Sequence, residues 1–127
     1  MTEGQPPTPA PSPIAPARFA GLIRRDAPAG CRVGLIGMPD DLGVRMNSGR
    51  PGAAGGPSAF REALAKYGVS EPHGWKWPAV YDAGDITPAA GDSPEALAQT
   101  HAAVSEAARR CASEGLVVAG IGGGHDL

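Results

Sequence analysis

The feature that most constrains the fold is a short apolar run that ends in three glycines. Residues 116–121 read Leu-Val-Val-Ala-Gly-Ile, and Gly122, Gly123 and Gly124 follow directly. An apolar run of this length is typical of a strand that is buried on both faces of a parallel sheet. Because glycine lacks a Cβ, the backbone after the strand can turn sharply or approach a ligand closely. We therefore expect a parallel sheet with a ligand-binding turn at the end of this strand.

His125 and Asp126 follow the glycines, at the carboxyl end of the predicted strand. Ligands of open α/β sheets bind at this edge. Imidazole is the commonest metal ligand among side chains, and a neighbouring carboxylate is either a second ligand or an outer-shell partner. A hydrogen-bonded structural histidine is the alternative interpretation. A nucleotide-binding loop is a further one, although His125 stands where G-x-G-x-x-G, counted from Gly120, requires its third glycine.

The remaining pattern alternates strands and helices. Strands are predicted at Arg32–Gly37 and Ala79–Asp82, and helices begin at Pro57 and Pro94. This order predicts a parallel sheet with right-handed crossovers and helices on its faces. Three strands make an incomplete core with an exposed apolar edge, so we expect the front part of a larger sheet.

Several polar and aromatic residues lie outside these elements or on their faces. The long segment 38–56 is interpreted as a substrate-binding loop, with a solvated loop as the alternative. Asp82 and Asp85 can attract a cation, but capping of a strand end is favoured. His101 falls on the buried face of the second helix and is interpreted as a packed or border residue. The tryptophans Trp75 and Trp77 are expected to cover a core edge, with the lining of an interface as the alternative.

Composition excludes several classes of function. The chain has 127 residues, a net charge of −2 and 5% aromatic residues, which argues against nucleic acid or an anionic membrane as partner. No apolar run approaches the roughly 20 residues of a membrane helix. Cys31 and Cys111 fit no C-x-x-C pattern and are expected to be reduced thiols in a cytoplasmic protein. Residues 1–28 are predicted to be a disordered, proline-rich tail, and residues 29–127 to form the domain.

Five segments of the chain form a recognisable series: Gly37–Val44, Asn47–Ala53, Gly56–Arg61, Asp82–Ile86 and Gly122–Asp126. In this order they resemble the ureohydrolases, the family of arginase, agmatinase and formimidoylglutamase. The resemblance covers roughly residues 32–127. The N-x-G-R-x-G-A loop and the triple-glycine histidine motif are most similar to the formimidoylglutamase branch, because arginases and agmatinases typically have an acidic residue where this chain has Gly124.

The resemblance implies a three-layer α/β/α fold with a parallel, arginase-like sheet, of which this chain is the N-terminal portion. It also implies a pair of Mn²⁺ ions bridged by a hydroxide, which attacks the carbon of a guanidinium or formimino group in a small linear amidine. His125 matches the first manganese ligand, and Asp126 would be its outer-shell neighbour. By a looser analogy, Asn47, Ser48, Gly49 and Arg50 would lie near the substrate mouth.

The remaining ligands of the family come from an Asp-x-His-x-Asp motif and a later Asp-x-Asp motif, neither of which occurs in these residues. One histidine cannot hold two metal ions, so the chain alone is expected to be incomplete and inactive. Its function would then belong to a longer chain, a homo-oligomer or a complex with a complementing C-terminal half. The alternative is a non-catalytic remnant or interaction module.

Overall fold

The computed structural model describes residues 18–127, and the first 17 residues of the predicted tail lie outside them. Two parallel strands form its centre, β2 (Val33–Met38) and β3 (Val80–Asp85), and the principal helices are α2 (Gly56–Lys66) and α3 (Pro94–Ser113). The remaining elements are η1 (Phe19–Leu22), β1 (Ile23–Arg24), α1 (Leu42–Met46), η2 (Ala53–Gly55), η3 (Pro72–Gly74) and β4 (Val117–Gly122). None of the helices in residues 18–127 has the length and apolar character needed to cross a membrane.

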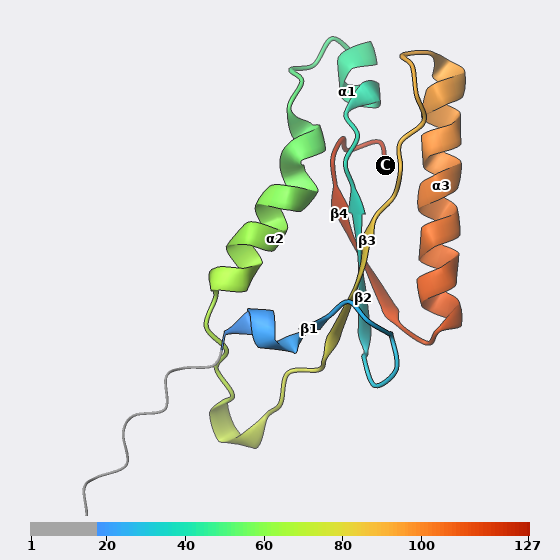
Figure 1. Ribbon diagram of the computed structural model, residues 1–127. Coiled ribbons are helices and arrows are strands. Elements are labelled where there is room, and N and C mark those ends of the chain that lie inside the picture. Colours follow the sequence, from blue (N-terminus) through green and yellow to red (C-terminus); the bar gives the residue numbers. More distant parts are fainter. Residues whose placement is uncertain (1–17) are drawn as a thin grey trace, which may run out of the picture.

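The strands form one parallel sheet in the order β1-β3-β2-β4. Strand β2 pairs with β3 through Val33 and Val80, and with β4 through Val33 and Val117. Helices α2 and α3 lie on opposite sides of this sheet (Figure 1). The predicted α/β sheet with helices on its faces is confirmed. The short strand β1, which pairs with the outer side of β3, was not predicted, because two residues are too few for a recognisable apolar pattern.

The core lies between the sheet and α3. It consists of Ile36, Met38, Ile86, Ala107, Cys111 and Leu116. Gly34 allows α3 to approach the sheet, since a Cβ at this position would lie 3.1 Å from the Sγ of Cys111. Burial raises the pKa of the Cys111 thiol. Ser93 caps the helix by accepting a hydrogen bond from the Ala96 amide at 3.2 Å, as expected for a serine at this position.

Strand β4 differs from its prediction. We expected it to be buried on both faces, but Val117 is 68% and Val118 37% exposed. The strand lies at an edge of the sheet and pairs only with β2 within the described residues. An apolar run shows that a strand is suited to burial, but the neighbours that bury it are set by tertiary structure. The expected exposed apolar edge is therefore present, and it is β4 that forms it.

The segment predicted as a long loop contains two short helices. Leu42 is buried and anchors α1, and η2 leads directly into α2. A helix of five residues gives too little periodicity to be predicted from apolar spacing.

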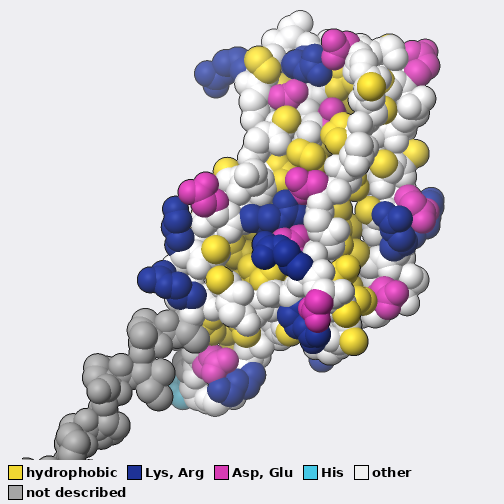
Figure 2. All heavy atoms as spheres, viewed as in Figure 1, with side chains coloured by type: hydrophobic (Ala, Val, Ile, Leu, Met, Phe, Trp, Pro, Cys, Tyr) yellow, Lys and Arg dark blue, Asp and Glu magenta, His cyan; other side chains and the backbone are white. Residues whose placement is uncertain are grey.

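Aromatic side chains surround an apolar hollow on the α2 side of the sheet. Trp77 packs edge-on against Phe19 and Trp75, with ring centroids 5.4 and 4.6 Å apart. Phe60 and Leu64 of α2 line the same hollow, whose volume is about 350 Å³. The tryptophans remain about half exposed, so they cover the core edge only in part. Figure 2 likewise shows hydrophobic side chains uncovered between charged ones over the middle of the molecule.

A buried ion pair joins α2 to the sheet. Arg61 donates two hydrogen bonds to the Asp82 carboxylate, each of 2.9 Å, and a further one to Asp85. The Asp82 side chain is 2% exposed and also accepts a hydrogen bond from the Gly84 amide, while Arg25 lies 3.3 Å from it. Burial alone would raise the pKa of Asp82, but these hydrogen bonds and positive charges outweigh it and hold that pKa below its ordinary value.

We predict that Arg61→Ala lowers the free energy of unfolding by about 3 kcal/mol, because it leaves the Asp82 carboxylate buried without its main partner. Urea unfolding measures this loss. The control is Lys66→Ala on the same helix, whose ion pair with Glu62 is exposed and is expected to contribute no more than about 0.5 kcal/mol. Equal losses for the two variants would contradict a central role of the buried pair.

The same pair predicts a pH dependence. The pKa of Asp82 is lowered on folding, so its contribution to stability is complete above the pKa of an unfolded aspartate, about 3.9, and is lost as the pH falls through the folded pKa. Asp82→Asn has no carboxylate at this position. We therefore expect the difference in unfolding free energy between the native protein and the variant to shrink below about pH 4. A difference that stays constant during acidification would contradict the prediction.

Candidate functional site

Three backbone segments meet at the carboxyl ends of β2 and β4. The Gly123 amide donates to the Met38 carbonyl at 3.1 Å, and the Gly124 amide donates to the Asp40 carbonyl at 2.8 Å. A Cβ at Gly123 would overlap both carbonyl oxygens, and a Cβ at Gly56 would overlap the carbonyl of Gly122. Gly122, which ends β4, and the two glycines after it all have negative φ, so close packing rather than a left-handed turn requires them here. We call residues 123–126 the histidine loop. The start of α2 and the backbone at the end of β2 therefore fix the path of this loop.

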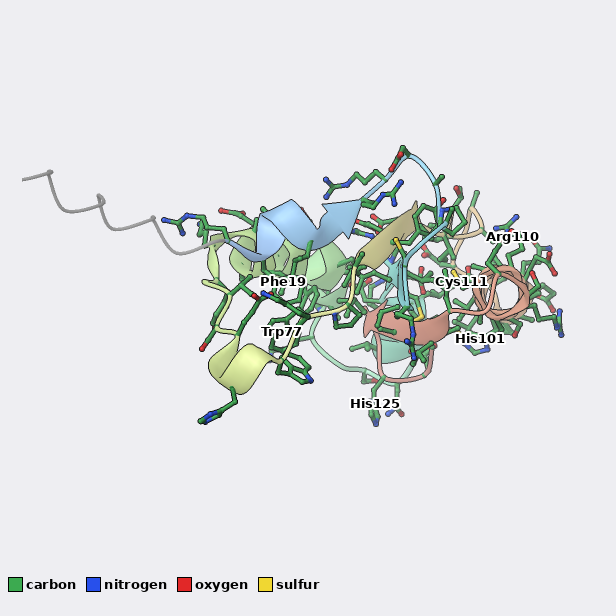
Figure 3. The ribbon with its side chains drawn as sticks, turned by 90° about the horizontal axis from the view of Figure 1, so that it is seen from below. Phe19, Trp77, His101, Arg110, Cys111 and His125 are labelled. Carbon is green, nitrogen blue, oxygen red and sulfur yellow. The ribbon has the colours of Figure 1, made fainter. Side chains whose placement is uncertain are left out.

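His125 is exposed and projects outward from this loop (Figure 3). Asp126, the next residue, has its Oδ2 3.0 Å from Nε2 of His101 on α3. The predicted border position of His101 is confirmed, since its side chain is 42% exposed. Sequence reasoning missed its contact with Asp126. The two residues are 25 positions apart, and no local spacing signals such a pair.

The described residues do not by themselves form a metal centre. Within residues 18–127 no three His, Cys, Asp or Glu side chains are grouped so that they could hold a metal ion. Metal sites in proteins generally need three or more protein ligands. Sequence reasoning considered Asp82 and Asp85 as a cation site. In the structure both carboxylates form ion pairs with Arg61. His125 is thus a single candidate ligand, and its neighbour Asp126 is engaged by His101.

The predicted substrate segment follows α1 as an exposed turn. Ser48 has a positive φ of 58°, and the Gly49 amide donates to the Val44 carbonyl at 2.8 Å, which closes the turn. Helix α1 itself packs on the histidine loop, since a Cβ at Gly124 would lie 3.1 Å from Cγ2 of Val44. The structure therefore brings α1, the helix before this turn, to the edge that carries His125. All four residues, Asn47, Ser48, Gly49 and Arg50, are exposed there.

Two acidic residues hold the backbone before and after α1. The Asp40 carboxylate is buried and accepts a hydrogen bond of 3.0 Å from the Leu42 amide. The Asp41 carboxylate accepts a hydrogen bond of 2.7 Å from the Gly52 amide and one of 3.1 Å from Arg45. The amide hydrogen bond from Gly52 is the main reason that the pKa of Asp41 is lowered. These carboxylates therefore order the segment 40–54.

We predict that Gly123→Ala destabilises the protein by about 1–3 kcal/mol, because the added methyl group overlaps the carbonyl oxygens of Met38 and Asp40. Thermal or urea unfolding measures the effect. Gly55→Ala is the matched control, since Gly55 has a φ of −77° and open space where its Cβ would lie. If both substitutions are tolerated equally, the close packing of the histidine loop is not required.

Sequence comparisons with known proteins identify similar enzymes. The chain is 42% identical over 110 residues to a formimidoylglutamase from Aromatoleum aromaticum, an alignment that covers 84% of this chain and 30% of that protein. It is 37% identical over 95 residues to a formimidoylglutamase from Salmonella typhi, covering 75% of this chain and 28% of that protein. The chain thus spans less than a third of the length of these relatives.

Solved structures give a consistent result. An arginase superfamily protein from Trypanosoma cruzi superposes with a TM-score of 0.73 at 30% identity, covering 87% of this chain and 37% of that one. A formiminoglutamase from the same organism, crystallised with Mn²⁺, has a TM-score of 0.68 at 30% identity. The superposition covers 87% of this chain and 38% of that one. A family model described as the arginase family matches residues 31–127, which is most of the sequence. The chain belongs to the arginase family.

Proposed function

We propose that this chain is the part of a manganese-dependent hydrolase that carries its first metal ligand, and that the complete enzyme cleaves C–N bonds of linear amidines as formimidoylglutamases do. Two observations support this function. The sequence relatives are formimidoylglutamases, up to 42% identical among those compared. A similar solved structure is a formiminoglutamase with bound Mn²⁺.

The position of His125 is the observation that carries the proposal. It is an exposed imidazole at the carboxyl end of a parallel strand, the edge at which α/β proteins bind ligands. Its loop is held by backbone hydrogen bonds to Met38 and Asp40, so the imidazole starts from a defined position. We assign His125 as a metal ligand and Asp126 as its outer-shell neighbour. The other ligands of a two-manganese site are proposed to come from residues outside this chain.

The turn Asn47–Arg50 is proposed as part of the substrate mouth. It follows α1, which packs on the histidine loop, and its four residues are exposed. Arg50 offers a guanidinium group, which binds carboxylates through two parallel hydrogen bonds. A glutamate-derived amidine carries such carboxylates, whereas a plain alkyl guanidine does not. The turn therefore fits the formimidoylglutamase type of substrate.

The exposed edge of β4 is the proposed contact for the missing part of the enzyme. Val117 and Val118 are exposed there, and β4 pairs only with β2 among the described residues. An apolar edge of this kind offers backbone hydrogen-bonding groups and side chains to another strand. We place a complementing C-terminal portion, or another subunit, along this edge.

The proposal is tested by His125→Asn in the full-length protein. We expect the substitution to remove an imidazole ligand and to weaken Mn²⁺ binding by at least about 100-fold. Elemental analysis after dialysis and titration with Mn²⁺ measure the loss. His73→Asn is the control, because His73 is an exposed histidine in η3, on a different segment, and asparagine tolerates its positive φ. Unchanged manganese occupancy in His125→Asn would overturn the assignment.

A further inference from the structure

The His101–Asp126 contact joins the helix on one face of the sheet to the loop after β4. His101 lies in the second turn of α3, and its Nε2 is 3.0 Å from Oδ2 of Asp126. Asp126 is the residue directly after the candidate ligand His125. The side chains are partly exposed, 42% for His101 and 29% for Asp126, so the contact lies at the rim of the domain and not in its core.

The Asp126 carboxylate is also enclosed by two glycines. A Cβ at Gly43 in α1 would overlap this carboxylate, and so would a Cβ at Gly124 in the loop itself. The carboxylate thus lies where α1, the β4 loop and His101 of α3 converge. Any larger residue at Gly43 would push it away from His101. This fit restricts Asp126 to a narrow range of positions.

The backbone of His125 is consequently held on both sides. Before it, the Gly124 amide is bound to the Asp40 carbonyl at 2.8 Å. After it, Asp126 is bound to His101, and the Leu127 amide closes the turn by donating to the Gly124 carbonyl at 3.3 Å. Two fixed neighbours limit the directions in which the imidazole between them can project. His125 itself points away from the domain (Figure 3).

We propose that His101 is a positioning residue: by binding Asp126 it fixes the direction in which the loop presents His125. The proposal rests on the proposed function, in which His125 is a metal ligand. Groups that orient ligands in this way raise metal affinity by about 10–100-fold, because the ligand does not have to be ordered when the metal binds. His101 acts through Asp126 and does not itself contact the metal.

The test compares His101→Ala with His101→Gln in the full-length protein. Glutamine carries an amide nitrogen that can donate to Asp126 in place of the imidazole Nε2, whereas alanine cannot. Gln99→Ala is the matched control, because Gln99 is an exposed polar residue on the same helix. Two quantities are measured for each variant: hydrogen exchange of the Gly124 and Leu127 amides in metal-free protein, and the dissociation constant for Mn²⁺ alone.

We expect His101→Ala to speed exchange of these amides about fivefold, as for one lost hydrogen bond. We also expect it to weaken Mn²⁺ binding about tenfold. His101→Gln should restore both values toward those of the native protein, and Gln99→Ala should change neither. If alanine at position 101 prevents folding, the glutamine variant still decides: native-like exchange and affinity support the proposal, and loss of either overturns it.

The two proposals can fail separately. Unchanged amide exchange in a folded His101→Ala variant would overturn the positioning role, whether or not His125 binds metal. Faster exchange in this variant, together with unchanged Mn²⁺ binding in His125→Asn, would overturn the proposed function and leave only the ordering of the loop by His101. A third outcome would overturn the positioning role alone. In it, His101→Ala exchanges its amides faster but keeps its Mn²⁺ affinity, while His125→Asn loses metal.

Discussion

The buried pair of Arg61 and Asp82 is the interaction on which the arrangement of the sheet depends. A carboxylate that is 2% exposed is stable only when its hydrogen bonds are satisfied, and here α2, β3 and the segment after β1 all contribute. Arg61 reaches from α2 to both Asp82 and Asp85, so this helix is tied to the carboxyl end of β3. Gly37 of β2 leaves room for the Asp85 carboxylate, which brings the central strand into the same cluster.

The cluster also accounts for an irregularity in the sheet. Between Leu35 and Gly37 the register of β2 against β3 shifts, because β3 contains one residue more than its partner. Gly84 lies in this bulge and adopts a positive φ of 84°. Its amide donates a hydrogen bond to the Asp82 carboxylate at 3.0 Å. Such bulges redirect a strand end. Here the bulge places the Asp85 carboxylate beside Gly37, just before the backbone segment Met38–Asp40 that anchors the histidine loop.

The sequence was informative wherever structure depends on neighbours along the chain. The strand at β2, the helices beginning near Pro57 and Pro94 and the placement of His125 after a strand all follow from local patterns. The contacts of Arg61 with Asp82 and of His101 with Asp126 span 21 and 25 residues, and no periodicity reports such pairs. The exposure of Val117 was mispredicted for the same reason, because burial depends on which strand lies alongside. Elements as short as β1 and α1 lack the length that a periodic pattern needs.

Hydrogen bonds to other parts of the chain hold the histidine loop. Met38, Asp40 and His101 supply its hydrogen bonds, and the close fits at Gly56 and Gly123 exclude alternative paths for the backbone. A site whose ligands come from distant segments benefits from this arrangement, since each ligand ordered in advance reduces the entropy lost when the metal binds. One imidazole held by such a scaffold binds a metal weakly, because affinity requires several ligands at once. In the proposed site, the scaffold contributes the position of His125, and further ligands brought to the same edge of the sheet would complete it.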